Sequence, residues 1–268
     1  MALTERELLR FKHPIAVPGV GIDMQDKIKN SRILVIGCGG LGATVIQYLS
    51  AAGVGVIGIA DYGVLLEEDL ARTPLFQIQD IRKHKAKMAS SRMWAFNPFT
   101  KHYPLLIQVK PENVLTVIRE FDIIIDCSQH QPTHLVVNDA CITTGKPFVI
   151  GEVHNWVAWW GGFNFPLAGG SKSASYRCVS KKIDEFRNFD AGALAFTHGA
   201  AATQLVNGVI QYILEVPGIG RLFSFDFLHQ QFNIESITPD AVVIEETLAK
   251  GLLTAEEYGM VIEPDVED

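Results

Sequence analysis

The feature that most constrains this 268-residue chain is a glycine-rich turn between two apolar runs. Residues 33–36 form a short, β-branched run that is typical of a buried parallel strand. The turn, Gly-Cys-Gly-Gly-Leu-Gly, occupies residues 37–42, and a helical pattern follows it. A second apolar run, residues 54–60, ends at Asp61. This order of strand, glycine turn, helix, strand and acid predicts a βαβ unit that binds a nucleotide.

Each part of this unit has a physical reason to be present. Glycine at positions 37, 39, 40 and 42 lets the backbone turn sharply and approach a phosphate without a Cβ between them. The helix that follows presents free N–H groups and the positive end of its dipole. Asp61 lies 24 positions after Gly37, near the roughly 20 expected of a carboxylate that binds ribose. The alternative is that Gly37, Gly39, Gly40 and Gly42 serve only close helix–strand packing.

The rest of the chain predicts an α/β, Rossmann-like fold with a mostly parallel, doubly wound sheet. Apolar runs and helical patterns alternate as far as residue 153, which is the pattern of a parallel sheet. The expected strands are 103–109, 123–126 and 146–153, and the expected helices are 80–95 and 111–119. Residues 128–145 are expected to form a loop followed by a helix. Antiparallel strands at 156–166, 222–227 and 231–237, with a long helix at 193–214, are expected to extend this sheet.

The same patterns divide the chain into three parts. Residues 1–30 are expected to form an N-terminal arm of helical pieces, interrupted at Pro14 and Pro18. Residues 31–247 form a single domain with a crossover loop at about 168–191. Residues 248–268 form an acidic C-terminal tail that we expect to pack loosely.

Composition excludes several classes of protein. The net charge of −7 gives no reason to expect nucleic-acid binding. No apolar run reaches the ~18 residues of a membrane span, and the N-terminus does not resemble a signal peptide. The four cysteines form no Cys-x-x-Cys pair, which favours reduced thiols in the cytoplasm and argues against a structural zinc site.

Taken together, these residues resemble the superfamily of ThiF, MoeB and the ubiquitin-activating enzymes. The resemblance covers residues 10–237. The residues that carry it are Arg32, the turn at 37–42, Ala-Ala-Gly-Val-Gly at 51–55, Asp61, Leu-Ala-Arg at 70–72, Lys85 and Ala86, Asn97 and Pro98, Ile-Ile-Ile-Asp-Cys-Ser at 123–128, Asn138, Cys141 and Gly-Lys-Pro at 145–147.

The resemblance implies the activating-enzyme fold in a homodimeric or pseudodimeric arrangement, of which we expect the homodimer. It implies ATP and Mg²⁺ as cofactors and adenylation of a carboxylate, usually the C-terminus of a ubiquitin-like or sulfur-carrier protein. Asp61 would then bind the ribose hydroxyls, while Arg72 and Lys85 would bind the triphosphate. From the residues alone, an ion pair of Arg72 with Glu67 or Asp69, and a solvated role for Lys85, remain open.

The chain departs from the family pattern at positions that touch the phosphates. Gln129 stands where the family places its magnesium-binding aspartate, and an amide is a poor Mg²⁺ ligand beside a carboxylate. Asp69 replaces an asparagine and brings negative charge to the site. His13 stands where the family has an arginine that reaches into the partner's ATP site, and His134 replaces a further arginine.

Two more family features are altered. The zinc-binding Cys-x-x-Cys pairs of MoeB-like members fall on residues 175–178 and 239–242, where only Cys178 remains, so no zinc is expected. The crossover-loop cysteine of thioester-forming members falls on Phe189. Cys178 is the thiol nearest to that loop, with either a chemical or a structural role.

Histidines after the predicted strands are further candidates. His130 and His134 follow Asp126, and His154 follows the strand at 146–153, where open α/β sheets bind ligands. The alternative for the first two is surface or helix-cap polarity. His198, inside the long helix, is expected to be a core or interface residue, and Asp126 a supporting one.

Three functional interpretations follow from the sequence. The first is an ATP-dependent adenylyltransferase, favoured by the glycine turn, Asp61, Arg72 and Lys85. The second is a degenerate member that binds a nucleotide or peptide as a scaffold or as an inactive subunit, favoured by the altered positions 13, 69 and 129. The third is an NAD enzyme that uses the same turn, which the residues after Asp61 make less favourable.

Overall fold

The computed structural model describes residues 2–184, 192–216 and 220–263, and its described part contains one eight-stranded sheet of order β3-β2-β1-β4-β5-β6-β7-β8. Strands β1 to β5 run parallel, and β6, β7 and β8 add antiparallel pairs to the edge at β5. The predicted fold class is therefore confirmed. The strands are β1 Arg32–Ile36, β2 Val56–Ala60, β3 Lys101–Leu105, β4 Ile123–Asp126, β5 Phe148–His154, β6 Val157–Phe163, β7 Arg221–Asp226 and β8 Gln231–Ser236.

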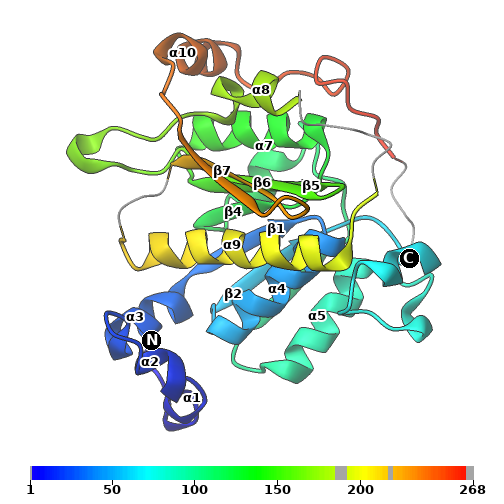
Figure 1. Cartoon of the computed structure of the whole chain (residues 1–268), viewed down its shortest axis with the longest axis vertical. Coiled ribbons are helices and arrows are strands. Elements are labelled where there is room, and N and C mark those ends of the chain that lie inside the picture. Colours follow the sequence, from blue (N-terminus) through cyan, green and yellow to red (C-terminus); the bar gives the residue numbers. More distant parts are fainter. Residues whose placement is uncertain (1, 185–191, 217–219, 264–268) are drawn as a thin grey trace.

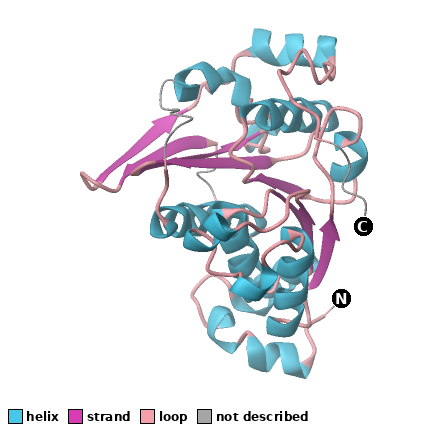
Figure 2. Cartoon of the chain, turned by 90° about the vertical axis from the view of Figure 1, so that its right-hand side faces the viewer, coloured by secondary structure: helices cyan, strands magenta, loops and turns pink. Residues whose placement is uncertain are grey.

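Helices cover both faces of the sheet (Figures 1 and 2). The face with α4, α5 and α9 has one buried cluster, and the face with α6, α7, α8 and the chain after α10 has another. The helices are α1 Glu5–Arg10, α2 Lys12–Ile15, α3 Gly21–Asn30, α4 Gly40–Ala52, α5 Lys85–Phe96, α6 Val114–Ile118, α7 Gln131–Thr144, α8 Ser180–Asp184, α9 Ala195–Ile213 and α10 Ala241–Lys250.

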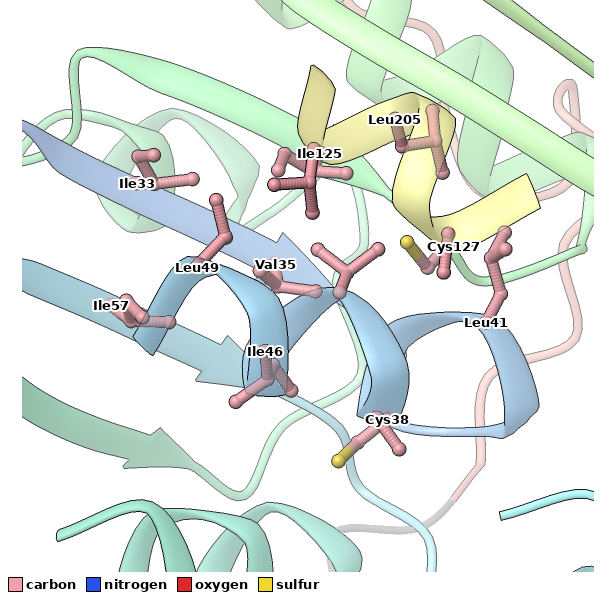
Figure 3. Close-up of a cluster of buried hydrophobic side chains, with 14 of the residues drawn as sticks. Ile33, Val35, Cys38, Leu41, Ile46, Leu49, Ile57, Ile125, Cys127 and Leu205 are labelled. Atoms are coloured by element: carbon pink, nitrogen blue, oxygen red, sulfur yellow. The ribbon is translucent and has the colours of Figure 1, made fainter. Parts of the chain in front are cut away.

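Strand β1 shows why its apolar run is continuous. Ile33 and Val35 pack into the cluster under α4 and α9, whereas Leu34 and Ile36 pack into the cluster on the other face. Because successive side chains of a strand point to opposite faces, a strand covered on both sides needs apolar residues throughout. Figure 3 shows the first cluster, in which Leu205 of α9 reaches the sheet beside residues of β1 and β4.

Some predicted element boundaries were wrong. The helix expected at 80–95 begins at Lys85, because residues 78–80 form a short 3₁₀ turn and Arg82 has a φ of 69°, outside the helical region. The strand expected at 103–109 is Lys101–Leu105. Pro14 lies inside α2 instead of interrupting it, since the N–H that proline lacks is not needed in a first helical turn.

The chain after β8 is more ordered than we expected. Helix α10 includes Thr247, where we placed the start of the tail. Beyond it, Ala255, Tyr258 and Met260 are buried against the face with α7, and the Tyr258 hydroxyl donates to Asp139 Oδ2 at 2.7 Å. These apolar side chains tie the tail to the core despite its acidic composition.

Residues 185–191 of the expected crossover loop, Phe189 among them, lie outside the described residues. Within the described ranges, no helix is both long and apolar enough to cross a membrane.

Candidate nucleotide-binding site

A pocket of about 610 Å³ lies at the carboxyl ends of β1, β2 and β4. This edge is where open α/β sheets bind ligands. Eight of the candidate residues predicted from the sequence line it together: Gly37, Gly39, Asp61, Asp69, Arg72, Lys85, Gln129 and His130. These residues come from the three connections that follow β1, β2 and β4, and the parallel sheet brings them to one edge.

The glycine turn builds the floor of this pocket. Gly37 has a φ of 88° and its N–H donates to Ala60 O at 2.8 Å, which joins the turn to β2. Gly39 lines the pocket, and α4 begins directly after it. Gly40 and Gly42 are not among the lining residues: they pack against His198 and the Gly37 carbonyl. Close packing therefore accounts for two of the four glycines.

Asp61 is held in place by the backbone around it. Its Oδ2 accepts from Cys38 N at 2.6 Å, and its Oδ1 accepts from Gly63 N at 2.7 Å. Each carboxylate oxygen has a second lone pair, so a ribose hydroxyl can still donate to it. The carboxylate is thus oriented before any ligand arrives.

The cations of the pocket surround Asp69. Arg72 Nη2 donates to Asp69 Oδ1 at 2.8 Å, so the ion pair left open by the sequence does form. Lys85 Nζ lies 4.0 Å from Asp69 Oδ2, and its side chain is 16% exposed, so it is not a solvated lysine. The start of α5 is fixed because Lys85 N donates to Gly63 O at 3.0 Å.

The protonation of Asp69 follows from these neighbours. Burial alone would raise the pKa of Asp69, but hydrogen bonds from Arg72 and the Leu66 backbone, with the charge of Lys85, hold that pKa below its usual value. The carboxylate is therefore ionised at neutral pH. Arg72 and Lys85 place two cations beside this carboxylate, in a pocket that Asp61, Glu68 and Glu263 also line.

Gln129 is used by the protein itself. Its φ is 54°, its Oε1 accepts from Val153 N at 3.0 Å, and its Nε2 lies 3.4 Å from His198 Nε2. The amide thus links the end of β5 to α9 instead of pointing an oxygen at a metal. Within the described residues, no three His, Cys, Asp or Glu side chains form a group able to hold a metal ion.

The predicted histidines have different environments. His130 lines the pocket at the N-cap of α7, and its Nδ1 lies 2.9 Å from Thr133 Oγ1. His134 is neither surface nor cap: it is fully buried between Asp126 and Glu152. His154 lies 2.7 Å from the same Glu152 carboxylate, and neither His134 nor His154 lines the pocket.

Two other predicted histidines complete the set. His198 is buried as expected, and burial lowers its pKa. Its ring lies under Gly40, where an added Cβ would approach it to 2.9 Å. His13 is exposed on α2 and does not line the pocket of its own chain.

The segment expected to have lost zinc ligands makes hydrogen bonds instead. Ser175 Oγ donates to Asn138 Oδ1 at 2.9 Å, and Asp240 caps α10 through the N–H groups of Val242 and Val243. Cys178 is partly exposed in a 3₁₀ turn.

Sequence reasoning missed one side of the pocket. Tyr62, Gln108, Val261 and Glu263 also line it. Tyr62 directly follows Asp61, so its place beside the pocket could have been predicted from the motif. The other three belong to no motif, and the C-terminal two are about 200 residues from the glycine turn.

The sequence of this chain matches a known protein family. Residues 11–241 match the model of the ThiF family. A sulfur carrier protein adenylyltransferase of Thermus thermophilus is 34% identical over 239 residues, which is 87% of this chain and 88% of that protein. A probable adenylyltransferase/sulfurtransferase, MoeZ of Mycobacterium tuberculosis, is 31% identical over 89% of this chain, which spans only 62% of the length of MoeZ.

Solved structures share the fold at lower identity. Escherichia coli MccB, crystallised with MccA-N7isoASN, has a TM-score of 0.75 and 20% identity, covering 88% of this chain and 73% of MccB. PaaA has a TM-score of 0.75 and 18% identity over 88% of this chain and 75% of PaaA. At these identities the likeness concerns the fold alone.

Proposed function

The chain belongs to the ThiF family, and on that premise we propose that it is an ATP-dependent adenylyltransferase that activates a carboxylate. The observation that carries this proposal is the pocket in which Gly39, Asp61, Arg72 and Lys85 meet at the N-terminus of α4. A nucleoside triphosphate needs backbone N–H groups and cations around its phosphates and an acceptor for its ribose hydroxyls, and this pocket has all three. An NAD enzyme would have no need for both cations.

The chemistry assigns a task to each of these groups. A substrate carboxylate oxygen attacks the α-phosphorus of ATP, the bond from that phosphorus to the α,β-bridging oxygen breaks, and pyrophosphate leaves with the bonding electrons. Arg72 and Lys85 offset the negative charge of the triphosphate and orient it. Mg²⁺, when bound, would supply further charge; because Gln129 is engaged with Val153, it would be held mainly by phosphate oxygens and water.

The relatives supply the substrate class. One is a sulfur carrier protein adenylyltransferase, and one of the MccB structures contains MccA. We therefore propose the C-terminal carboxylate of a small sulfur-carrier or ubiquitin-like protein, or of a peptide, as the group that this chain activates.

Oligomeric state and compartment belong to the same proposal. His13 is exposed and away from its own pocket, so a role for it at an ATP site requires a second copy of the chain. A homodimer would have twice the 29.6 kDa mass of the chain, which light scattering measures. All four cysteines are free, which supports a reducing compartment such as the cytoplasm.

The proposal predicts ATP binding that depends on Lys85. Titration calorimetry with ATP and Mg²⁺ should show binding, and Lys85→Ala should weaken it about 10- to 100-fold, because a charge-assisted phosphate contact is worth about 1.5–3 kcal/mol. Lys87→Ala, at an exposed position of the same helix outside the pocket, is the control and should have little effect. No heat with ATP, together with no carboxylate-dependent pyrophosphate exchange, would contradict the enzyme proposal.

A non-catalytic member of the family is the second candidate. The observation that favours it is that Asp69 and Gln129, the two altered polar groups of the pocket, are occupied by protein partners. Gln129→Asp separates the two candidates, because the shorter side chain cannot keep the bond to Val153 and adds a carboxylate. For an active enzyme we expect exchange to fall by up to about tenfold with that lost hydrogen bond. Exchange that is absent in the natural chain and appears in Gln129→Asp would favour the binding protein.

A further inference from the structure

A closed circuit of polar contacts joins the ends of β4 and β5, which are neighbours in the sheet (Figure 1). Asp126 Oδ2 lies 2.7 Å from His134 Nδ1, and Glu152 Oε1 lies 2.6 Å from His134 Nε2. At the next residue of β5, Val153 N donates to Gln129 Oε1 at 3.0 Å. Because Gln129 follows Asp126 by three residues, these contacts and the backbone between them close a circuit, which we call the polar ring.

The sheet register explains how the polar ring forms. Asp126 is paired with Ile150 of β5. Side chains alternate between the two faces along a strand, so Asp126 and Glu152 lie on the same face as Ile150. That face is covered by α7, which carries His134. Two carboxylates from adjacent strands therefore meet one imidazole from the helix above them.

This part of the polar ring is buried and charged. Asp126, His134 and Glu152 are each 0% exposed, and the rings of Trp159 and Tyr176 pack edge-on against the imidazole. A carboxylate only accepts hydrogen bonds, so both nitrogens of His134 donate and the imidazole is a cation. Buried carboxylates are costly without a paired cation. The cation therefore holds the two strand ends together.

The other side of the polar ring holds Gln129 in an uncommon backbone conformation. Strand β4 ends at Asp126 whereas β5 continues to His154, so the N–H of Val153 lies beyond the end of β4 and takes Gln129 Oε1 as its acceptor. Gln129 has a φ of 54°, which a residue with a Cβ rarely adopts. Such a conformation persists only where the surrounding contacts impose it.

The residues inside the polar ring form one side of the nucleotide pocket. Cys127, Ser128 and Gln129 all line it. Ser128 N donates to Asp126 Oδ1 at 2.9 Å, so a carboxylate of the ring also orients this loop directly. The loop lies against the glycine turn, because a Cβ built on Gly37 would approach the Cys127 carbonyl oxygen to 2.8 Å. A shift of residues 127–129 would therefore disturb the floor of the pocket.

We infer that His134 and Glu152 are positioning residues, which hold residues 127–129 and the glycine turn in the form that binds the triphosphate. Neither residue lines the pocket, so both act through the loop. This inference rests on the proposed function, because it takes ATP as the ligand. Position 134 is one at which the chain departs from the family pattern, so the polar ring is not part of the motif that identified the family.

The polar ring makes this positioning depend on pH. The titratable side chains around His134 are Asp126 of β4, Glu152 and His154 of β5, Cys141 of α7 and Tyr176 of the 3₁₀ turn at 176–178. Burial would lower the pKa of His134, but the charge of Asp126 and the contacts with both carboxylates raise it to about 9. The cation is therefore present below that pH and is lost as the pH rises through it.

A double-mutant cycle on ATP binding by the full-length chain tests the inference. Glu152→Gln keeps the shape of the side chain and removes its charge. Gln129→Gly opens the other side of the polar ring and tolerates the positive φ. Each change should weaken ATP binding about tenfold, the effect of one lost polar contact. Because both open the same ring, the double variant should also be about tenfold weaker, not about hundredfold as for independent changes.

Glu7→Gln is the matched control for Glu152→Gln. Glu7 is also buried and paired with a cation, Lys29, at 2.8 Å, but it lies on α1 outside the pocket. Its ATP binding should stay within about twofold of the natural chain. Between about pH 7.5 and pH 9.5, the natural chain and Glu7→Gln should lose about tenfold more affinity than Glu152→Gln, whose ring is already open. Titration of Lys85 is common to all three and cancels in this comparison.

Hydrogen exchange separates this inference from the proposal beneath it, because it needs no nucleotide. Peptides that cover residues 127–130 and 152–154 should exchange about tenfold faster in Glu152→Gln than in Glu7→Gln. Faster exchange without any ATP binding by the natural chain would remove the proposed function alone, since the ring would still hold the loop. Equal exchange in the two variants, or a double variant about hundredfold weaker than the natural chain, would overturn the inference.

Discussion

Replacing Gly42 with alanine is expected to lower the free energy of unfolding by about 3 kcal/mol or more, the upper part of the range for overpacking. A Cβ at position 42 would lie 1.8 Å from the Gly37 carbonyl oxygen, which is backbone and cannot rotate away. The turn would have to open, and α4 would then move away from β1. Urea denaturation followed by circular dichroism measures the loss.

Gly39→Ala is the matched variant for this prediction. Gly39 has a φ of −82°, and a Cβ built there meets no atom within 4 Å, so stability should stay within about 0.5 kcal/mol of the natural chain. Because Gly39 lines the pocket, the added methyl should still weaken ATP binding. Equal stability of the natural chain and Gly42→Ala would show that the close approach of the two glycines is not needed.

The contrast between these glycines shows what the motif could predict. The spacing of the glycines and the flanking apolar runs define β1, α4 and β2 through local rules, and the structure has all three. The motif treats its four glycines alike. Which of them open toward a ligand and which only pack depends on the Cβ directions in the folded backbone, and the sequence does not contain these.

The pocket was predictable to the extent that topology determines it. Parallel strands place their carboxyl ends at one edge, so residues that follow β1, β2 and β4 had to meet. The hydrogen-bond or ion-pair partner of each side chain was not predictable. Arg72 had a phosphate-binding and an ion-paired alternative, and the choice depends on its 2.8 Å distance to Asp69 Oδ1. The bond between Gln129 and Val153 N was not foreseen, because it depends on where β5 ends in the folded sheet.

Two features were beyond sequence reasoning for a different reason. The segment that reaches the pocket near Glu263 carries no motif, and its approach depends on burial of Tyr258 and Met260 against a distant helix. His134 is enclosed by Asp126 and Glu152, which come from neighbouring strands. Their proximity requires the sheet register as well as the strand order.

That enclosure of His134 gives the second large effect. His134→Gln is expected to lower the free energy of unfolding by about 3 kcal/mol near pH 6, because it leaves two buried carboxylates without their cation. His134 is 0% exposed and lies 2.7 Å from Asp126 Oδ2 and 2.6 Å from Glu152 Oε1. His229→Gln, at an exposed histidine paired with Asp226, is the control and should leave the stability nearly unchanged, because solvent screens an exposed ion pair.

The pH dependence of this effect has a definite sign. Burial alone would lower the pKa of His134, but the charge of Asp126, the hydrogen bond that His134 Nδ1 donates to Asp126 and the nearby Glu152 carboxylate raise it from 6.5 to about 9. A group whose pKa is raised in the folded state contributes its full stability below its unfolded pKa and loses it as pH rises through the folded value. The natural chain should therefore lose about 3 kcal/mol between pH 6.5 and 9 that His134→Gln does not lose. Urea titrations across this range would contradict the charged state of His134 if the two stability profiles ran parallel.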